Sequence, residues 1–177
     1  MSTDTALVVI DVQVGLIEEA YQCREVLDHI NTLLSGARDS HTPVVYIQHD
    51  GGRGHGLEVG TPGWQIHPAI APREGELIVH KRASDSFHKT PLQDELEARG
   101  INHLVIAGGQ TEYCIDTTVR RATTLGYKVT LAGDAHTTYD TDLLTAAQII
   151  AHHNYTLDGF RTDQNAITVK PTDEITF

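Results

Sequence analysis

The sequence predicts an α/β fold in which a parallel β-sheet lies between two layers of helices. Short, continuous apolar runs alternate along the chain with segments whose apolar residues recur at helical spacing. Strands that are apolar throughout are typical of parallel sheets that are buried on both faces. Two of these runs end in an ionisable residue, Asp11 and Lys81, and a third leads into a turn that contains Cys114. Such strand ends are where α/β proteins keep their chemistry.

Length and charge limit what the chain can be. We expect residues 1–177 to form a single domain with one core. A formal net charge of −11, from 24 acidic and 13 basic residues, argues against binding to nucleic acid or to an anionic membrane. The acidic start and the lack of an apolar run of about 18 residues predict a cytoplasmic protein. Two cysteines, Cys23 and Cys114, are too few for a disulfide framework.

The first third of the chain has the pattern strand, helix, strand. Ala6–Val12 predicts a central strand, so Asp11 is a carboxylate at the end of a buried strand and needs a partner. It is either a base or a cap of the following turn. Apolar positions from about Tyr21 to Ala37 recur at three and four and predict an amphipathic helix. Val44–Ile47 predicts the second strand, which leads into Gln48.

A long glycine-rich segment, 51–68, follows and contains the only tryptophan, Trp64. Loops of this length inside a compact domain are more often functional than incidental. Trp64 therefore either walls a pocket or packs in the core. Glu76–Lys81 predicts the third strand, whose final lysine is either a surface residue or a buried cation.

The remaining elements follow from similar signals. Thr90–Gln93 predicts a capping box with proline at the first helical position, and Gly100 predicts the end of that helix. His103–Gly109 and Lys128–Ala132 predict the fourth and fifth strands, and Ala166–Lys170 predicts a sixth strand at an edge. Between the last two we expect a long amphipathic helix, whose apolar face comprises Leu143, Leu144, Ala147, Ile150 and Ala151.

The turn after the fourth strand is the strongest candidate for a reactive site. If Thr111 is the N-cap of the next helix, Cys114 is its third residue, where the helix dipole lowers the pKa of the thiol. A thiolate there can attack a carbonyl carbon while the N–H groups of Cys114 and of Gln110 or Thr111 hold the oxyanion. The alternative is that Cys114 is a small buried apolar residue.

The segment Gly-Gly-Gln-Thr-Glu-Tyr-Cys-Ile-Asp-Thr-Thr, residues 108–118, resembles the cysteine segment of the isochorismatase-like cysteine hydrolases. This superfamily includes nicotinamidases and N-carbamoylsarcosine amidases. Val8–Gln13 and Ile78–Lys81 are two further marks of the family, and the resemblance runs from about Ala6 to Phe160. It implies a three-layer, Rossmann-like α/β/α fold with a six-stranded parallel sheet in the order 3-2-1-4-5-6.

The resemblance also implies a function. Its catalytic triad falls on Asp11, Lys81 and Cys114, which predicts a cysteine-dependent hydrolase that cleaves an amide, lactam or carbamoyl C–N bond of a small molecule through a thioester. It further implies a non-proline cis peptide at 109–110, no cofactor, and a homo-oligomer. The N–H groups of Gln110, Thr111 and Cys114 are the oxyanion candidates. The side chains that we expect to bind substrate are Gln13, Gln48, Trp64, Phe87 and Tyr113.

One departure from the family pattern concerns metal. Nicotinamidases carry Asp-x-His after the second strand, whereas this chain has His49-Asp50-Gly51-Gly52 there. We therefore predict no metal, although Asp50, His55 and His67 are of the residue types that bind zinc. The departure also makes nicotinamide a less suitable substrate.

Other functions stay open at the level of sequence. The chain could be an isochorismatase-type vinyl-ether hydrolase or a catalytically silent interaction protein. A nucleotide-binding module is weakly supported, because the glycine-rich turn lacks the third glycine of the dinucleotide fingerprint. Basic amides such as a streptothricin-type lactam, simple carboxamides and N-carbamoyl compounds all fit as substrates.

Overall fold

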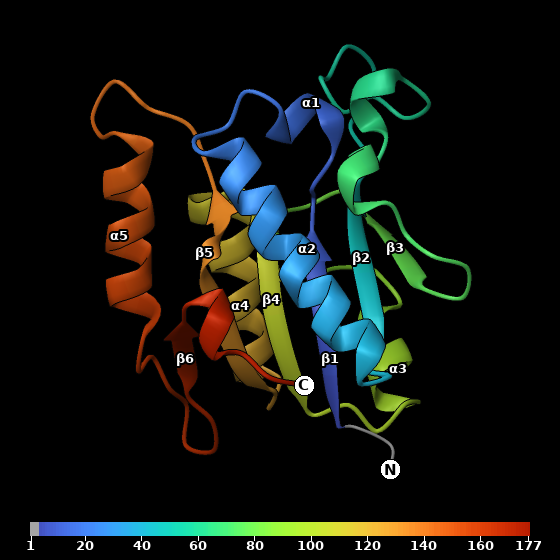
Figure 1. Ribbon diagram of the computed structural model, residues 1–177, viewed down its shortest axis with the longest axis vertical. Helices are drawn as coiled ribbons and strands as arrows, with labels where there is room; N and C mark the ends of the chain where they lie inside the picture. Colours follow the sequence, from blue (N-terminus) through green and yellow to red (C-terminus); the bar gives the residue numbers. More distant parts are fainter. Residues whose placement is uncertain (1–3) are drawn as a thin grey trace.

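A six-stranded, all-parallel sheet forms the centre of the structure, a computed structural model that describes residues 4–177 (Figure 1). The strand order is β3-β2-β1-β4-β5-β6, which confirms the predicted α/β fold and order. β1 lies at the centre, where Ile10 is opposite Ile47 of β2 and Gly108 of β4. The strands are β1 (Thr5–Ile10), β2 (Val44–His49), β3 (Leu77–Lys81), β4 (His103–Gly109), β5 (Lys128–Thr137) and β6 (Ile167–Lys170).

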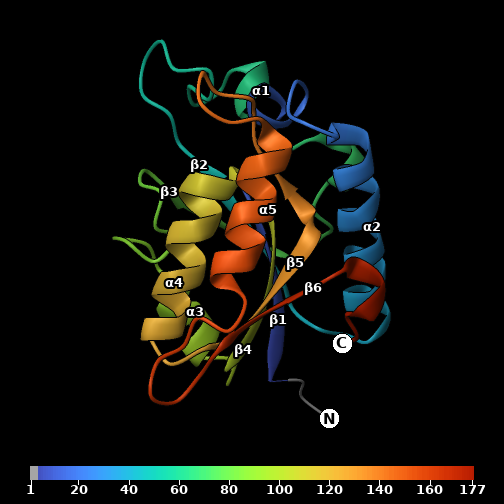
Figure 2. The ribbon, with the colours of Figure 1, turned by 90° about the vertical axis from the view of Figure 1, so that its left-hand side faces the viewer.

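Helices cover both faces of this sheet (Figure 2). α2 (Cys23–Asp39) lies on one face, and the other face carries α3, α4 and α5. The short helix α1 (Val14–Ile17) and the 3-10 turn Pro62–Trp64 sit beyond the carboxyl ends of the strands, whereas the 3-10 turn Pro68–Ile70 packs against α2 and accepts a hydrogen bond from Tyr46 of β2. The bounds of the other three helices are Leu92–Glu97 for α3, Asp116–Thr124 for α4 and Ala146–Leu157 for α5. Within residues 4–177, none of the helices is both long and apolar enough to cross a membrane.

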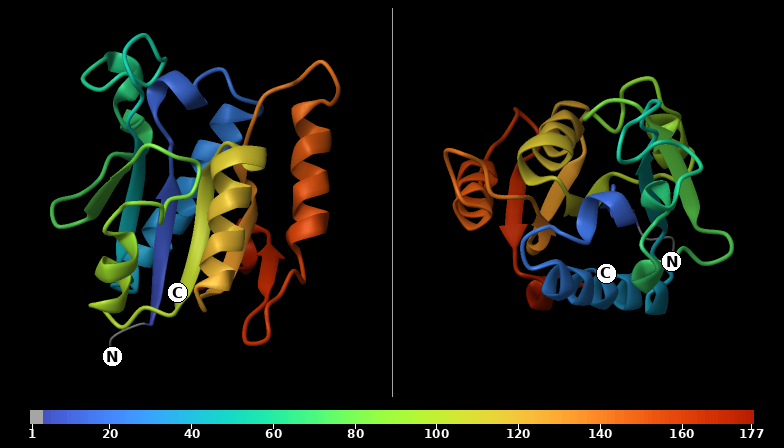
Figure 3. Two further views of the ribbon diagram at one scale, coloured as in Figure 1. Left: turned by 180° about the vertical axis from the view of Figure 1, so that it is seen from behind. Right: turned by 90° about the horizontal axis from the view of Figure 1, so that it is seen from above.

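The carboxyl ends of the parallel strands all meet at one edge of the sheet, which Figure 3 shows from above in its right panel. The chain crosses this edge at three places that matter here. These are residue 11 after β1, residues 110–115 after β4, and the long segment 50–76 between β2 and β3. Ligands of open α/β sheets bind outside the strand ends at the point where the strand order reverses, between β1 and β4.

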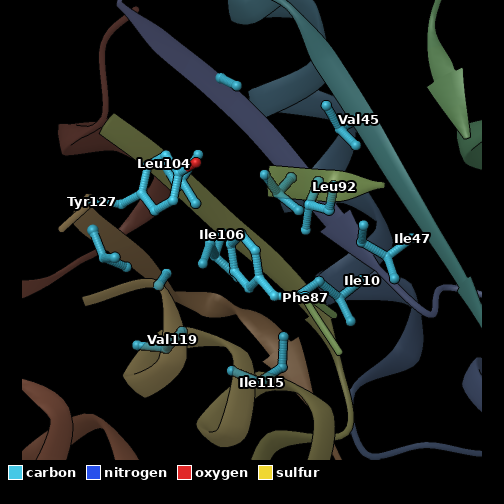
Figure 4. Close-up of a cluster of buried hydrophobic side chains, with 14 of the residues drawn as sticks. Ile10, Val45, Ile47, Phe87, Leu92, Leu104, Ile106, Ile115, Val119 and Tyr127 are labelled. Carbon is cyan, nitrogen blue, oxygen red and sulfur yellow. The ribbon is translucent and has the colours of Figure 1, made fainter. Parts of the chain in front are cut away.

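Both faces of the sheet are packed, which explains why its strands are apolar throughout. On β1, Val8 and Ile10 join the cluster under α3 and α4, whereas Leu7 and Val9 join the cluster under α2. Figure 4 shows the first cluster, in which Phe87 lies among strand residues such as Ile10. Alternate residues therefore pack against opposite helical layers, and none of the four reaches water.

Two predicted helix starts differ from the structure. α3 begins at Leu92, and Pro91 rather than Thr90 is its cap residue. The Thr90 hydroxyl donates to the Ser86 carbonyl at 2.6 Å, and Gln93 donates to Glu97 rather than back to the cap. The predicted capping box therefore does not form: the Thr90 hydroxyl accepts from the Leu92 N–H at 3.4 Å and not from Gln93, and the Gln93 side chain does not return to Thr90.

The helix α5 begins later than predicted and presents a different face. Its capping box is formed by Thr145 and Gln148, so Leu143 and Leu144 precede the helix and are 91% and 45% exposed. Figure 1 shows α5 at the margin of the molecule, away from the centre of the sheet. Because it packs only on this margin, the residues that it buries are fewer than the predicted face: Ala146, Ile149 and Leu157.

Candidate active site

The backbone around Asp11 brings the first strand against the cysteine turn. Asp11 has a positive φ of 52°, a conformation for which Asp is enriched among residues other than glycine, and its N–H donates to Ile47 at 2.9 Å. Opposite it, Gly108 has φ 126°, and a Cβ on this residue would lie 2.0 Å from the Ile10 carbonyl oxygen. Only glycine allows this approach, and it sets Asp11 beside the segment that carries Cys114.

The ammonium of Lys81 contacts both other residues of the predicted triad. Its Nζ lies 2.6 Å from Asp11 Oδ2 and 3.1 Å from Cys114 Sγ, and it donates to the Ala83 carbonyl at 2.9 Å. The side chains of Lys81 and Asp11 are fully buried, and Cys114 is 9% exposed. Lys81 is therefore a buried cation with three acceptors, not a surface lysine. The structure brings the three predicted residues together.

Burial shifts the protonation of this cluster toward its neutral forms. It raises the pKa of the Asp11 carboxyl above its ordinary value, although Lys81 acts in the opposite direction. Burial, with Asp11 beside it, also raises the pKa of the Cys114 thiol to about 11. The predicted lowering of this pKa is thus wrong, because loss of solvent outweighs the stabilising charge of Lys81. The resting cysteine is a thiol that needs a base when it reacts.

The turn that holds Cys114 differs from the predicted N-cap. The peptide between Gly109 and Gln110 is cis, as the family resemblance implies. Gln110 is the cap residue, and Thr111–Ile115 forms a π-helical turn before α4. The Ile115 N–H donates to the Gln110 carbonyl at 3.1 Å. Cys114 is therefore the fourth helical residue instead of the third, and Thr111 is not the N-cap.

The Thr111 side chain instead joins a buried chain of hydrogen bonds that the sequence did not suggest. Its hydroxyl lies 2.9 Å from His136 Nδ1, and His136 Nε2 lies 2.8 Å from Asn154 Oδ1. Because the Asn154 amide nitrogen donates to Gly133, its oxygen accepts from His136, and Nδ1 must accept from Thr111. Burial lowers the pKa of His136 to about 4, so the ring is neutral at pH 7. The cysteine turn is thereby linked to α5.

A cavity of about 250 Å³ opens onto the sulfur. Of the five side chains predicted to bind substrate, Tyr113 lines this cavity and is 55% exposed. Two histidines that were not predicted to bind substrate, His49 and His55, also line it. The complete lining consists of Asp11, Leu16, His49, His55, Leu57, Ser84, Gln110, Tyr113 and Cys114.

The other four predicted substrate ligands have structural partners. Gln13 and Gln48 each donate to the Trp64 carbonyl, at 2.8 and 2.9 Å, and Gln13 also donates to the His49 carbonyl at 3.0 Å. The Trp64 indole donates to Asp50 at 2.9 Å. Phe87 stacks on Tyr127 in the core. These residues build the walls behind the site rather than its lining, because their polar groups and faces are already occupied.

The three residues considered for zinc have separate partners. Asp50 accepts from Trp64 and lies 3.0 Å from His80 Nδ1. His55 Nδ1 accepts from the Leu57 N–H, and His67 Nδ1 accepts from the Ala69 N–H. Across residues 4–177, His, Cys, Asp and Glu side chains do not form a group of three with the geometry to hold a metal ion.

A parallel sheet of this order, with a cysteine, a lysine and a carboxylate in contact beyond its strand ends, defines an α/β protein whose candidate site lies beside the switch point of the sheet. The isochorismatase domain model matches residues 5–156. The chain therefore belongs to the isochorismatase family.

Three similar proteins illustrate this relationship. Streptothricin hydrolase of Streptomyces noursei is 38% identical over 76% of this chain and 50% of its own length. The chain thus spans about half the length of that relative. Ureidoacrylate amidohydrolase RutB of Klebsiella pneumoniae is 28% identical over 59% of this chain and 56% of its own. A solved isochorismatase hydrolase of Oleispira antarctica has a TM-score of 0.89 and 31% identity, with 98% of this chain and 97% of that chain covered.

Proposed function

We propose that the chain is a cysteine-dependent hydrolase that cleaves an amide, lactam or carbamoyl C–N bond of a small molecule through a thioester. The observation that carries this proposal is the position of the Lys81 ammonium, 2.6 Å from the Asp11 carboxylate and 3.1 Å from the Cys114 sulfur. A cation that contacts both groups stabilises the negative charge on either one as the proton moves between them. The names of two relatives, a hydrolase and an amidohydrolase, agree with this reaction.

In the first half-reaction Asp11 takes the thiol proton and the sulfur attacks the substrate carbonyl carbon. Asp11 suits this role because its Oδ1 is buried without a hydrogen-bond partner within residues 4–177, and its raised pKa brings it closer to that of the thiol. The carbonyl oxygen becomes an oxyanion, held by the N–H groups of Gln110, Thr111 and Cys114. When the C–N bond breaks, protonated Asp11 gives its proton to the leaving nitrogen.

In the second half-reaction water hydrolyses the thioester. Asp11 takes a proton from the water, the hydroxide attacks the thioester carbon, and the C–S bond breaks. The sulfur recovers its proton from Asp11, and the acyl part leaves as a carboxylic acid. Lys81 keeps its proton throughout and acts only through its charge and its hydrogen bonds.

Ammonia or amine release from a panel of amides, lactams and carbamoyl compounds tests this function. Turnover should disappear in Cys114→Ala and persist in the matched control Cys23→Ala, since Cys23 lies away from the cavity. Mass spectrometry of the intact protein during turnover should detect an acyl group on Cys114. Unchanged turnover in Cys114→Ala would refute the nucleophile.

If no compound of the panel is turned over, the second candidate is favoured, an isochorismatase-type hydrolase of a vinyl ether. Such a reaction protonates a carbon and requires no thiol. The raised pKa of Asp11 is the observation that supports it, because a higher pKa makes the protonated, acidic form of this carboxyl easier to reach. Asp11→Asn would then abolish turnover while Cys114→Ala would not.

We also expect this hydrolase to act in the cytoplasm as a homo-oligomer. Light scattering of the purified protein measures the second expectation directly.

A further inference from the structure

Two histidine rings lie side by side on one wall of the cavity that contains Cys114. His49 is the last residue of β2, and His55 comes from the glycine-rich segment. Their ring centroids are 5.8 Å apart and their planes are inclined by 33°. The backbone of His49 is fixed on both sides by Gln13, which accepts from its N–H at 2.8 Å and donates to its carbonyl at 3.0 Å. The backbone of His49 is therefore fixed at the cavity that Cys114 also lines.

The hydrogen bonds of each ring determine which nitrogen carries the hydrogen. His55 Nδ1 accepts from the backbone N–H of Leu57 at 3.0 Å, so this nitrogen carries no hydrogen. His49 Nδ1 lies 3.4 Å from the ammonium of Lys81, and a positive charge at this distance disfavours an N–H directed at it, so this nitrogen also carries no hydrogen. A neutral imidazole with a bare Nδ1 carries its hydrogen on Nε2. Burial and the nearby Lys81 lower the pKa of His49, which keeps its ring neutral at pH 7.

The charge of the cavity limits what these donors can bind. Lys81 is already paired with Asp11, and neither arginine nor any other lysine lines the cavity in the part of the chain that the structure describes. A substrate carboxylate would therefore lose its hydration without gaining a cation. A neutral oxygen with lone pairs, such as a carbonyl, loses less and suits two N–H donors.

We propose that His49 and His55 form a donor pair that binds a second, neutral carbonyl oxygen of the substrate, next to the bond that Cys114 attacks. This role of the two histidines rests on the proposed function and narrows its range of substrates. The substrate class becomes small amides with a further carbonyl group, such as diamides, N-acylureas and ureido compounds. The volume of about 250 Å³ restricts the part of the molecule inside the cavity to a few such groups.

The tautomers can be measured without any substrate. Long-range ¹H–¹⁵N spectra of protein labelled with ¹⁵N-histidine at pH 7.5 distinguish an Nε2–H ring from an Nδ1–H ring. Loss of the corresponding signals in His49→Gln and His55→Gln assigns the two rings. We expect Nε2–H for both. An Nδ1–H tautomer at either ring would overturn the proposal, because the donor would then point away from its assigned ligand.

Binding is then measured in Cys114→Ala, so that the ligand is not consumed and the outcome does not depend on hydrolysis. The probes are propionamide, with one carbonyl, malonamide, with two, and malonamate, in which the second group is a carboxylate. Dissociation constants come from backbone amide shifts during titration. We expect malonamide to bind best and the removal of one donor to weaken it about five-fold, the typical effect of a single neutral hydrogen bond.

The variants of His55 distinguish the effect of its N–H donor on binding from the effect of its ring shape. In the Cys114→Ala background, His55→Phe should bind malonamide about five-fold more weakly with little change for propionamide. His55→Gln, which keeps an N–H near the Nε2 position, should retain the affinity for malonamide. His152→Phe on the exposed side of α5 is the matched control and should bind like the parent. Equal binding of malonamide and propionamide by the parent, tighter binding of malonamate, or no saturable shift with malonamide would each overturn the proposal. If one of these results were found but the wild-type protein hydrolysed simple amides, the donor pair would be refuted and the proposed function would stand.

Discussion

Replacing Lys81 with methionine should destabilise the fold more than any loss of a surface charge. The change removes the partner of a fully buried carboxylate at 2.6 Å and leaves Cys114 and the Ala83 carbonyl without a donor. Breaking a buried ion pair by removing one partner costs about 3 to 5 kcal/mol. Exposed pairs, such as Arg99 with Glu95, contribute about 1 kcal/mol or less. Urea unfolding at pH 7.5 measures the difference in the free energy of unfolding.

The loss should also depend on pH with a defined sign. Without the charge of Lys81, burial raises the pKa of Asp11 further, against only the hydrogen bond of Cys114 and the influence of His49, so the pKa of this carboxyl in the folded protein lies above its value in the unfolded chain. The folded state then keeps a proton that the unfolded state releases. Stability is therefore present at low pH and falls as the pH rises through the folded pKa. Lys81→Met should lose less relative to the parent at pH 5 than at pH 8.

The double variant Asp11→Asn, Lys81→Met tests the reasoning, because it removes the buried charge as well as its partner. It should recover most of the loss and should show no pH dependence from this site. A cost below about 1 kcal/mol for Lys81→Met at pH 7.5 would refute the buried-pair argument. So would a double variant that is no more stable than the single one.

Three further results follow from the geometry. The free energy of unfolding should fall by roughly 3 kcal/mol between pH 6.5 and pH 4, because His136 stays neutral in the fold, with a pKa of about 4, while the unfolded chain takes up a proton. Urea titrations of the parent measure this fall, and His136→Gln should lack it. Gly108→Ala should destabilise the fold by roughly 4 kcal/mol or more, since its Cβ would lie 2.0 Å from the Ile10 carbonyl oxygen. Thermal unfolding measures this loss, with Gly52→Ala, whose Cβ meets open space, as the control. Alkylation of Cys114 by iodoacetamide should accelerate roughly tenfold per pH unit up to about pH 11, and a plateau near pH 7 would contradict the raised pKa of the thiol.

The fold could be predicted because its signals are local and repeated. Alternate residues of β1 pack on opposite helical layers, and this requires the unbroken apolar run that the sequence shows. The predicted apolar face of α2 is buried as expected, from Val26 to Ala37. The prediction for α5 was wrong because the helix packs at the margin of the sheet. The spacing of apolar residues shows which of them share a helix face, but it cannot show how much of that face the sheet covers.

Only those residues of the candidate site could be predicted that lie both in a family motif and at or just after the end of a strand. Asp11, Lys81 and Cys114 each stand at the carboxyl end of a strand, so the strand order brings them to one edge. The pKa of the thiol was mispredicted because burial is a property of the whole fold and outweighs the helix dipole. His55 was considered only as a zinc candidate and His49 only in the departure from the nicotinamidase pattern, since nothing local to either residue shows that it lines the cavity of Cys114.

The interactions of Gln13 have a consequence for how this protein can change. Its amide ties the end of β1 to the carbonyls of His49, just before the glycine-rich segment, and of Trp64 within it. We therefore expect that residues between these anchors can be exchanged without moving Asp11, provided that Gly51 and Gly63, at which a Cβ would meet backbone atoms, are kept. Grafting the corresponding segment of a relative between His49 and Trp64 offers a route to a new specificity that leaves the reactive groups where they are.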